Sequence, residues 1–176
     1  MLRRLMVAAI SAAALVVSTT AYAQKAEYGT AAEAKAMLER TVAAIKADKA
    51  KTLAMINKGE GGFVDRDLYA ACSTLDGKVT AHPDQTRLGM NRNDMKDVTG
   101  KAYGQEILKV AAEGKIAEVT YMFPRLGADK TPVQKVSLVS MVDDQICLVG
   151  YTNRLQLDAN EGRRISHPRP HVRLIT

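Results

Sequence analysis

The sequence has no tryptophan and only two cysteines and three histidines in 176 residues, and this scarcity excludes several kinds of functional site. The cysteines form no CxxC motif, so the sequence contains neither a thiol redox motif nor a cysteine-based zinc motif. It also contains no glycine-rich phosphate loop and no recognisable set of nucleophile, base and orienting residue. We therefore expect no cofactor, no metal and no enzymatic activity, with a small enzyme that uses His82 as an alternative.

The first residues have the pattern of a secretory signal peptide. Arg3 and Arg4 precede an apolar run at residues 5–17, and residues 21–23 (AYA) have the small-x-small form of a cleavage site. The apolar run is too short for a comfortable membrane span. We therefore predict a signal peptide at 1–23, export to the periplasm, and no membrane span after cleavage.

Positive charge is concentrated near the two ends of the chain. The formal net charge of +6 includes Arg3 and Arg4, and residues 154–176 hold five arginines against two acidic residues, so the part between is nearly balanced. A nucleic-acid-binding domain would keep a basic patch with aromatic residues in its folded part, so we expect no nucleic-acid partner. We predict a basic, flexible tail at 154–176. An alternative function is a secreted protein-interaction or envelope-surface module that uses this tail.

Two histidines in the tail, His167 and His171, share a face only on a helix. The two prolines between and beside them exclude a helix, so we expect a solvated, extended segment there and no metal site.

The most informative stretch is 68–97. Residues 68–74 are compatible with a strand that is covered on both faces, because polar and apolar residues do not alternate cleanly. Asp76-Gly77 is a strong hairpin signal, and residues 78–81 return as the partner strand. Pro83 ends that strand, since proline has no N–H for the ladder. A polar loop rich in groups that could hold a small molecule follows.

The remaining elements place helices and strands in separate groups. Helical periodicity and caps predict two helices after Thr30 and Asp48 and a third at 102–113, while strands are predicted at 115–123, 133–142 and 145–152. Strands joined by hairpins, with helices beside them, indicate an α+β fold with an antiparallel sheet.

Cys72 and Cys147 each lie inside a predicted strand. In an oxidising compartment they could form a disulfide. Two buried thiols on separate strands are the alternative, and the sequence alone leaves both open.

A set of short motifs in a fixed order resembles a single Cache domain of the secreted or receptor-ectodomain type. The motifs are Phe63, Asp67-Leu68-Tyr69, Leu75-Asp76-Gly77, Ala81-His82-Pro83, Leu88-Gly89, Asn91, Lys96-Asp97, Gly100-Lys101 and Tyr121. The resemblance implies a PAS-like five-stranded antiparallel sheet, with a long N-terminal helix on one face and a small-molecule pocket on the other. We assign the Cache-like ligand-binding domain to residues 24–153.

The resemblance also implies a function. Family members mostly sense small metabolites, often short carboxylates or amines, and pass the signal to a kinase or chemotaxis module. We expect a periplasmic sensor domain for a small organic anion such as a short carboxylate, read by a membrane receptor or sensor kinase.

Five residues are the candidates for ligand binding, because a carboxylate requires several donors in a partly apolar pocket. They are Tyr69, His82, Arg87, Tyr121 and Lys135. For His82 the alternative is a structural hydrogen bond to the loop backbone, and for the two tyrosines it is a place in the core. Lys135 lies among apolar strand residues, where a lysine that faces inward needs a partner or a ligand.

Two loop residues have weaker claims. Arg92 lies beside Arg87 in the loop that would cover the pocket, and a solvated side chain is its default state. Asp97 is expected to pin the loop rather than to bind a ligand.

Overall fold

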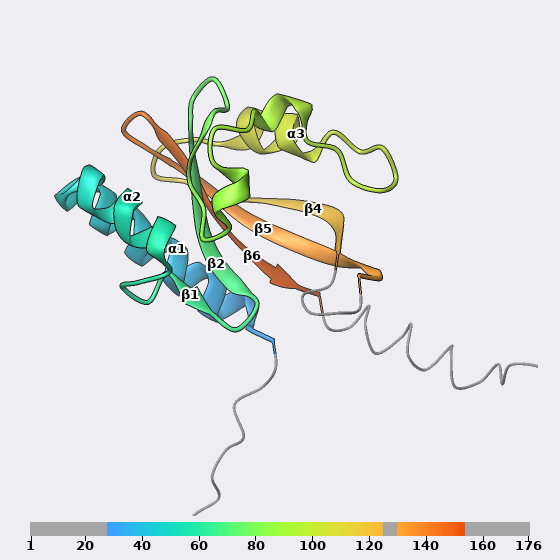
Figure 1. Ribbon diagram of the computed structural model, residues 1–176, viewed down its shortest axis with the longest axis horizontal. Coiled ribbons are helices and arrows are strands. Elements are labelled where there is room, and N and C mark those ends of the chain that lie inside the picture. Colours follow the sequence, from blue (N-terminus) through green and yellow to red (C-terminus); the bar gives the residue numbers. More distant parts are fainter. Residues whose placement is uncertain (1–27, 125–129, 154–176) are drawn as a thin grey trace, which may run out of the picture.

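An antiparallel sheet with helices against both faces forms the part of the chain that the computed structural model describes, residues 28–124 and 130–153 (Figure 1). The predicted signal peptide (1–23) and basic tail (154–176), with its histidine pair, lie outside the described residues. Within these residues, no helix combines the length and the apolar composition that a membrane crossing requires.

Two helices pack on one face of the sheet. Thr30 caps α1 (Ala31–Ala47), as predicted: its side chain accepts from Glu33 N while the Glu33 carboxylate accepts from Thr30 N, which together form a capping box. Asp48 ends α1 and caps α2 (Lys49–Lys58) through Lys51 N, as predicted. α1 buries one apolar stripe that includes Leu38 and Ile45.

Six strands form the sheet, which confirms the α+β class. They are β1 (Val64–Asp65), β2 (Leu68–Thr74), β3 (Val79–Ala81), β4 (Ala117–Pro124), β5 (Pro132–Val142) and β6 (Gln145–Thr152). The order is β1-β2-β6-β5-β4. β3 pairs with the same edge of β2 as β1 does, but with the later residues of β2. Five strands were predicted; the sixth, β1, has two residues and is too short to give a periodic pattern.

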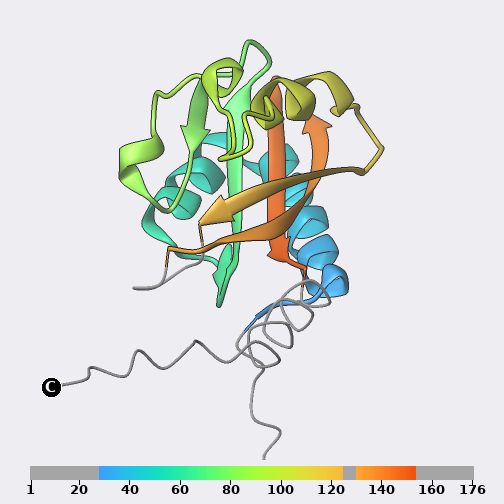
Figure 2. The ribbon, with the colours of Figure 1, turned by 90° about the vertical axis from the view of Figure 1, so that its right-hand side faces the viewer.

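The other face carries the polar loop and a third helix. The loop contains two short 3-10 turns, η1 (Gln85–Arg87) and η2 (Arg92–Asp94), and leads to α3 (Tyr103–Val110). α3 is shorter than the predicted helix at 102–113, because the chain turns extended at Ala111 and the Ala112 carbonyl accepts from Met141 N at the end of β5. In Figure 2, α1 lies behind β5 and β6, with the segment from β3 to α3 on the other side of the sheet.

β2 is buried on both faces, as predicted. Leu68, Ala70 and Cys72 join the core against α1 and α2. Tyr69 and Ala71 point the other way and join the core beneath α3. The candidate site therefore lies on the face of the sheet that is opposite α1.

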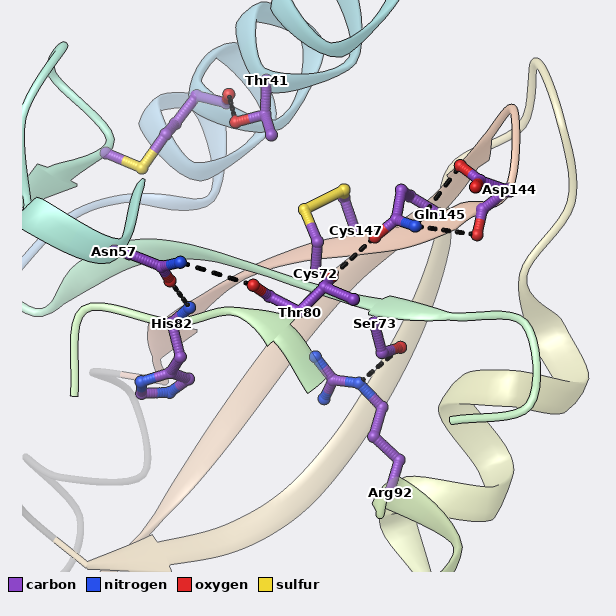
Figure 3. Close-up of a disulfide and its surroundings, with 11 residues drawn as sticks. Thr41, Asn57, Cys72, Ser73, Thr80, His82, Arg92, Asp144, Gln145 and Cys147 are labelled. Atoms are coloured by element: carbon purple, nitrogen blue, oxygen red, sulfur yellow. Dashed lines mark hydrogen bonds between the residues drawn. A yellow bond between two sulfur atoms is a disulfide. The ribbon is translucent and has the colours of Figure 1, made fainter. Parts of the chain in front are cut away.

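Cys72 and Cys147 form a disulfide, which is one of the two alternatives that the sequence leaves open (Figure 3). The two residues lie directly opposite each other in the antiparallel pair of β2 and β6, with Cα atoms 4.1 Å apart. The bond therefore joins the two central strands at a fixed register.

We predict that the double substitution Cys72→Ala/Cys147→Ala lowers the free energy of unfolding by about 4 kcal/mol, because the disulfide closes a loop across a sequence separation of 75 residues. Urea unfolding of the oxidised protein and the double variant measures the difference. A reductant should destabilise the wild-type protein and leave the variant unchanged. Equal stability of the two proteins would contradict the prediction.

Candidate functional site

A cavity of about 30 Å³ lies between the sheet and the polar loop. It is lined by residues of β2, β3, β4, β6, α3 and the loop: Tyr69, Ala71, Val79, His82, Arg87, Arg92, Met95, Tyr103, Tyr121, Phe123 and Leu148. Four of the five predicted ligand-binding residues are in this set. The fifth, Lys135, is not.

Arg92 is buried, contrary to the expectation of a solvated side chain. Its default state in a loop is solvated, but the structure leaves it only 4% exposed. Its Nε donates to Ser73 Oγ at 2.9 Å (Figure 3), while its Nη2 is buried and has no hydrogen-bond partner within the described residues. Burial lowers the pKa of this guanidinium, but an arginine still keeps its charge. The cavity wall therefore holds a positive charge with an unused donor.

The hairpin turn between β2 and β3 holds the backbone of Arg92. Gly77 adopts a φ of 100°, which glycine tolerates, and its carbonyl accepts from Arg92 N at 2.9 Å. Asn93 Nδ2 donates to the Asp76 carbonyl at 3.0 Å. The Asp76-Gly77 turn predicted from the sequence thus supports the loop that carries Arg92.

Gly104 holds Arg92 from the other side. A Cβ at this position in α3 would lie 1.8 Å from the Arg92 carbonyl oxygen and 3.0 Å from Met95 Cβ. Glycine therefore allows α3 to approach η2 closely enough to bury the arginine.

Three tyrosines supply hydroxyl groups around the cavity. Tyr103 and Tyr121 are stacked, with ring centroids 4.1 Å apart, and the Tyr121 hydroxyl lies 2.9 Å from Ser137 Oγ. Burial raises the pKa of all three tyrosines, that of Tyr69 to about 12. The tyrosines are therefore neutral at pH 7, and their hydroxyl groups can donate.

His82 has both a structural contact and a place in the cavity wall. Its Nδ1 accepts from Asp84 N at 2.9 Å, which is the structural hydrogen bond to the loop backbone that the sequence left as the alternative. Burial, followed by the charge of Arg87, lowers its pKa to about 4, so the ring is neutral at pH 7. Because Nδ1 accepts a hydrogen bond, the single ring proton must be on Nε2, which is then a donor.

Arg87 lies at the boundary between the cavity and the surface. Its guanidinium carbon is 5.5 Å from the centre of the Phe123 ring, and its Nε is 3.9 Å from Asp84 Oδ2. It also lines two outer pockets, next to Met90 and next to Val64.

Lys135 lies on the same face of the sheet, next to the cavity. It is 4% exposed, and its Nζ is 4.7 Å from the centre of the Tyr69 ring and 3.3 Å from the Asp67 carbonyl oxygen. Burial lowers its pKa to about 8. Lys135 therefore contacts the ring of Tyr69, a cavity residue, but does not line the cavity itself.

Asp97 pins the loop, as predicted. Its carboxylate accepts from the backbone N–H groups of Thr99, Lys101 and Met122, and these bonds hold its pKa near 2. It attaches the loop to the outer edge of β4.

The cavity is chemically suited to an anion. Its lining has two guanidinium groups, three tyrosine hydroxyls and a neutral imidazole, and no carboxylate. In the part of the chain that the structure describes, no group of three or more His, Cys, Asp or Glu side chains is arranged to hold a metal ion. Donors in a partly apolar enclosure are what a carboxylate requires.

Comparison with known families and structures agrees with this description. The family model of Single Cache domain 2 matches residues 6–161. A methyl-accepting chemotaxis protein from Vibrio parahaemolyticus RIMD 2210633 is 19% identical with a TM-score of 0.56, over 68% of this chain and 85% of that chain. No curated protein is significantly similar.

Two further solved structures are similar to the chain. A Cache chemosensory domain described for its recognition of carboxylic acids is 21% identical with a TM-score of 0.50, over 68% of this chain and 85% of that chain. A periplasmic sensor domain of a chemotaxis protein is 19% identical with a TM-score of 0.49, over 68% and 87%. At these identities the likeness is one of fold.

We predict that Gly104→Ala lowers the free energy of unfolding by about 1–3 kcal/mol, because the new methyl group would overlap the Arg92 backbone. In a helix, alanine is normally more stable than glycine, so a loss of stability in Gly104→Ala would point to the steric overlap. Urea unfolding gives the difference, and Lys109→Ala, at an exposed position of α3, is the control. A more stable Gly104→Ala protein would show that the close approach is not a constraint.

We predict that Lys135→Met raises the free energy of unfolding at pH 7 by on the order of 2 kcal/mol, because a buried charge is replaced by an apolar chain of similar length. The folded-state pKa of about 8 lies below the value of 10.5 expected for the unfolded chain. The penalty is therefore complete below pH 8 and fades as the pH rises toward 10.5.

Urea unfolding at pH 7 and pH 10 tests this, with the exposed Lys115→Met as the matched control. The advantage of Lys135→Met should be smaller at pH 10. A loss of stability at pH 7 would mean that the lysine is fully compensated by its partners.

Proposed function

The chain belongs to the Single Cache domain 2 family, a family of sensor domains, and from this premise we propose that it is a periplasmic sensor for a small organic anion, with short carboxylates as the class of ligand. The cavity beside Arg92 is the binding site. The ligand contacts Tyr69, His82, Arg87 and Tyr121. Lys135 supports Tyr69 by holding its ammonium group against the tyrosine ring.

One observation carries this proposal: the buried Arg92 Nη2 has no partner within the described residues. A buried polar group without a hydrogen bond costs about 1–3 kcal/mol, and more if it is charged. A carboxylate in the cavity would accept from this nitrogen and neutralise the guanidinium. The site is therefore of higher energy when empty, and it favours an anion over a neutral molecule.

The remaining donors surround the same space. The hydroxyls of Tyr69, Tyr103 and Tyr121 and the Nε2–H of His82 are neutral donors at pH 7, so they can complete the coordination of a carboxylate without adding charge. The cavity of about 30 Å³ holds roughly two water-sized groups. A carboxylate has two oxygens, so its head group matches this space.

Two further facts support the class and the compartment. A solved Cache chemosensory domain of the same fold recognises carboxylic acids. The Cys72–Cys147 disulfide suits an oxidising compartment. We extend the proposal to a leader at 1–23, a ligand-binding domain at 24–153 and a basic tail at 154–176, and to a chemotaxis receptor or sensor kinase as the partner that reads the bound state.

We predict that a short carboxylate at a hundred times its dissociation constant stabilises the protein by about 2.7 kcal/mol and raises its melting temperature by several degrees. A thermal-shift screen with acetate, propionate, lactate and pyruvate measures this. Arg92→Met should abolish the shift, because it removes the charge while keeping a buried chain of similar length.

The matched control is Arg40→Met, which removes an exposed arginine from α1 on the opposite face. It should leave the shift unchanged. The proposal fails if no carboxylate produces a shift, or if Arg92→Met binds as well as the wild type.

A further inference from the structure

A second, larger pocket adjoins the cavity on its outer side. It has a volume of about 240 Å³ and shares Tyr69, His82, Arg87 and Phe123 with the lining of the inner cavity. The two spaces therefore have these four side chains as common walls.

The inner cavity is too small for more than a head group. At about 30 Å³ it holds roughly two water-sized groups, which the two oxygens of a carboxylate would fill. The carbon chain of a ligand bound at Arg92 must therefore lie elsewhere, and the adjoining pocket offers the space.

The outer pocket has an apolar floor. Val64 from β1, Pro83 and the Phe123 ring contribute carbon surface, together with the ring of Tyr69. Val64 is 38% exposed, so an apolar side chain remains in contact with water until something covers it.

The charged groups around this floor are already paired. Arg66 Nη2 lies 2.6 Å from Glu33 Oε1 and 2.9 Å from Asp65 Oδ2. Arg87 Nε lies 3.9 Å from Asp84 Oδ2. Because both arginines that line this pocket already have carboxylate partners, a second anionic group would gain little there, and the pocket favours an uncharged chain over the far end of a dicarboxylate.

A third space, of about 420 Å³, lies on the other side of Arg87 and is more polar. Asn91, Asp94 and Lys96 contribute to its wall, and it does not include Phe123. It is therefore a poorer place for a hydrocarbon chain.

We infer that the preferred ligand is a monocarboxylate with an apolar tail, whose head group pairs with Arg92 and whose tail passes Arg87 and Phe123 to lie on Val64 and Pro83. This inference rests on the proposed function, since it places the head group in the same site. Arg87, between the two spaces, lies beside the first carbons of the tail.

The test is calorimetric titration of the purified protein with straight-chain acids from acetate to octanoate. Each methylene that enters an apolar pocket should tighten binding by about fourfold, until the outer pocket is full. Val64→Asp should weaken hexanoate binding at least tenfold and change acetate binding by less than twofold. Val64→Thr, which keeps the shape of the side chain, should show a smaller loss of the same kind if Val64→Asp does not fold.

The matched control is Val98→Asp, since Val98 is 65% exposed and lines none of the three spaces. It should bind both acids as the wild type does. Equal affinity for acetate and hexanoate would overturn the inference and leave the proposed function intact. The inference would also be overturned if affinity still rose with chain length in both Val64 variants. Failure of every acid to bind would overturn both proposals.

Discussion

The constraint on which the rest of the structure depends is that β2 is buried on both faces. Alternate residues of this strand serve two different purposes, with Cys72 in the core against α1 and Ser73 facing the cavity loop. A slip of one residue in its pairing with β6 would exchange the two faces. The disulfide joins Cys72 to Cys147, which lies directly opposite it in this pair, so the bond also keeps Ser73 in register with Arg92.

The site is built at the expense of stability. Arg92 and Lys135 are both about 4% exposed, and burial lowers the pKa of each. A domain of this size has only a small margin of stability, so two poorly compensated buried cations are a large cost. Such a cost is reasonable where a ligand of opposite charge offsets it, because binding then shifts the energy of the whole domain and not only of the pocket.

The sequence predicted those parts of the fold that depend on local hydrogen bonds. The capping residues Thr30 and Asp48 and the turn at Asp76-Gly77 act within a few residues of themselves, and the structure confirms all three. It also brings Tyr69, His82, Arg87 and Tyr121 into one cavity wall. The burial of Arg92 could not be predicted, because it depends on Gly77 and Gly104, which contact Arg92 only after the turn and α3 have packed together.

The cavity is physically connected to both ends of the described domain through Asp67. Its carboxylate accepts from Gly29 N at 2.6 Å, just before α1, and from Thr152 N at 3.0 Å, at the end of β6. Its carbonyl accepts from Lys135 Nζ, which lies over the Tyr69 ring. A ligand that displaced Tyr69 would therefore also shift Lys135, which is bonded to Asp67, a residue that joins both ends of the described domain. Because packed interiors respond in discrete steps rather than by gradual deformation, a shift of Tyr69 would reach Gly29 and Thr152 through Lys135 and Asp67.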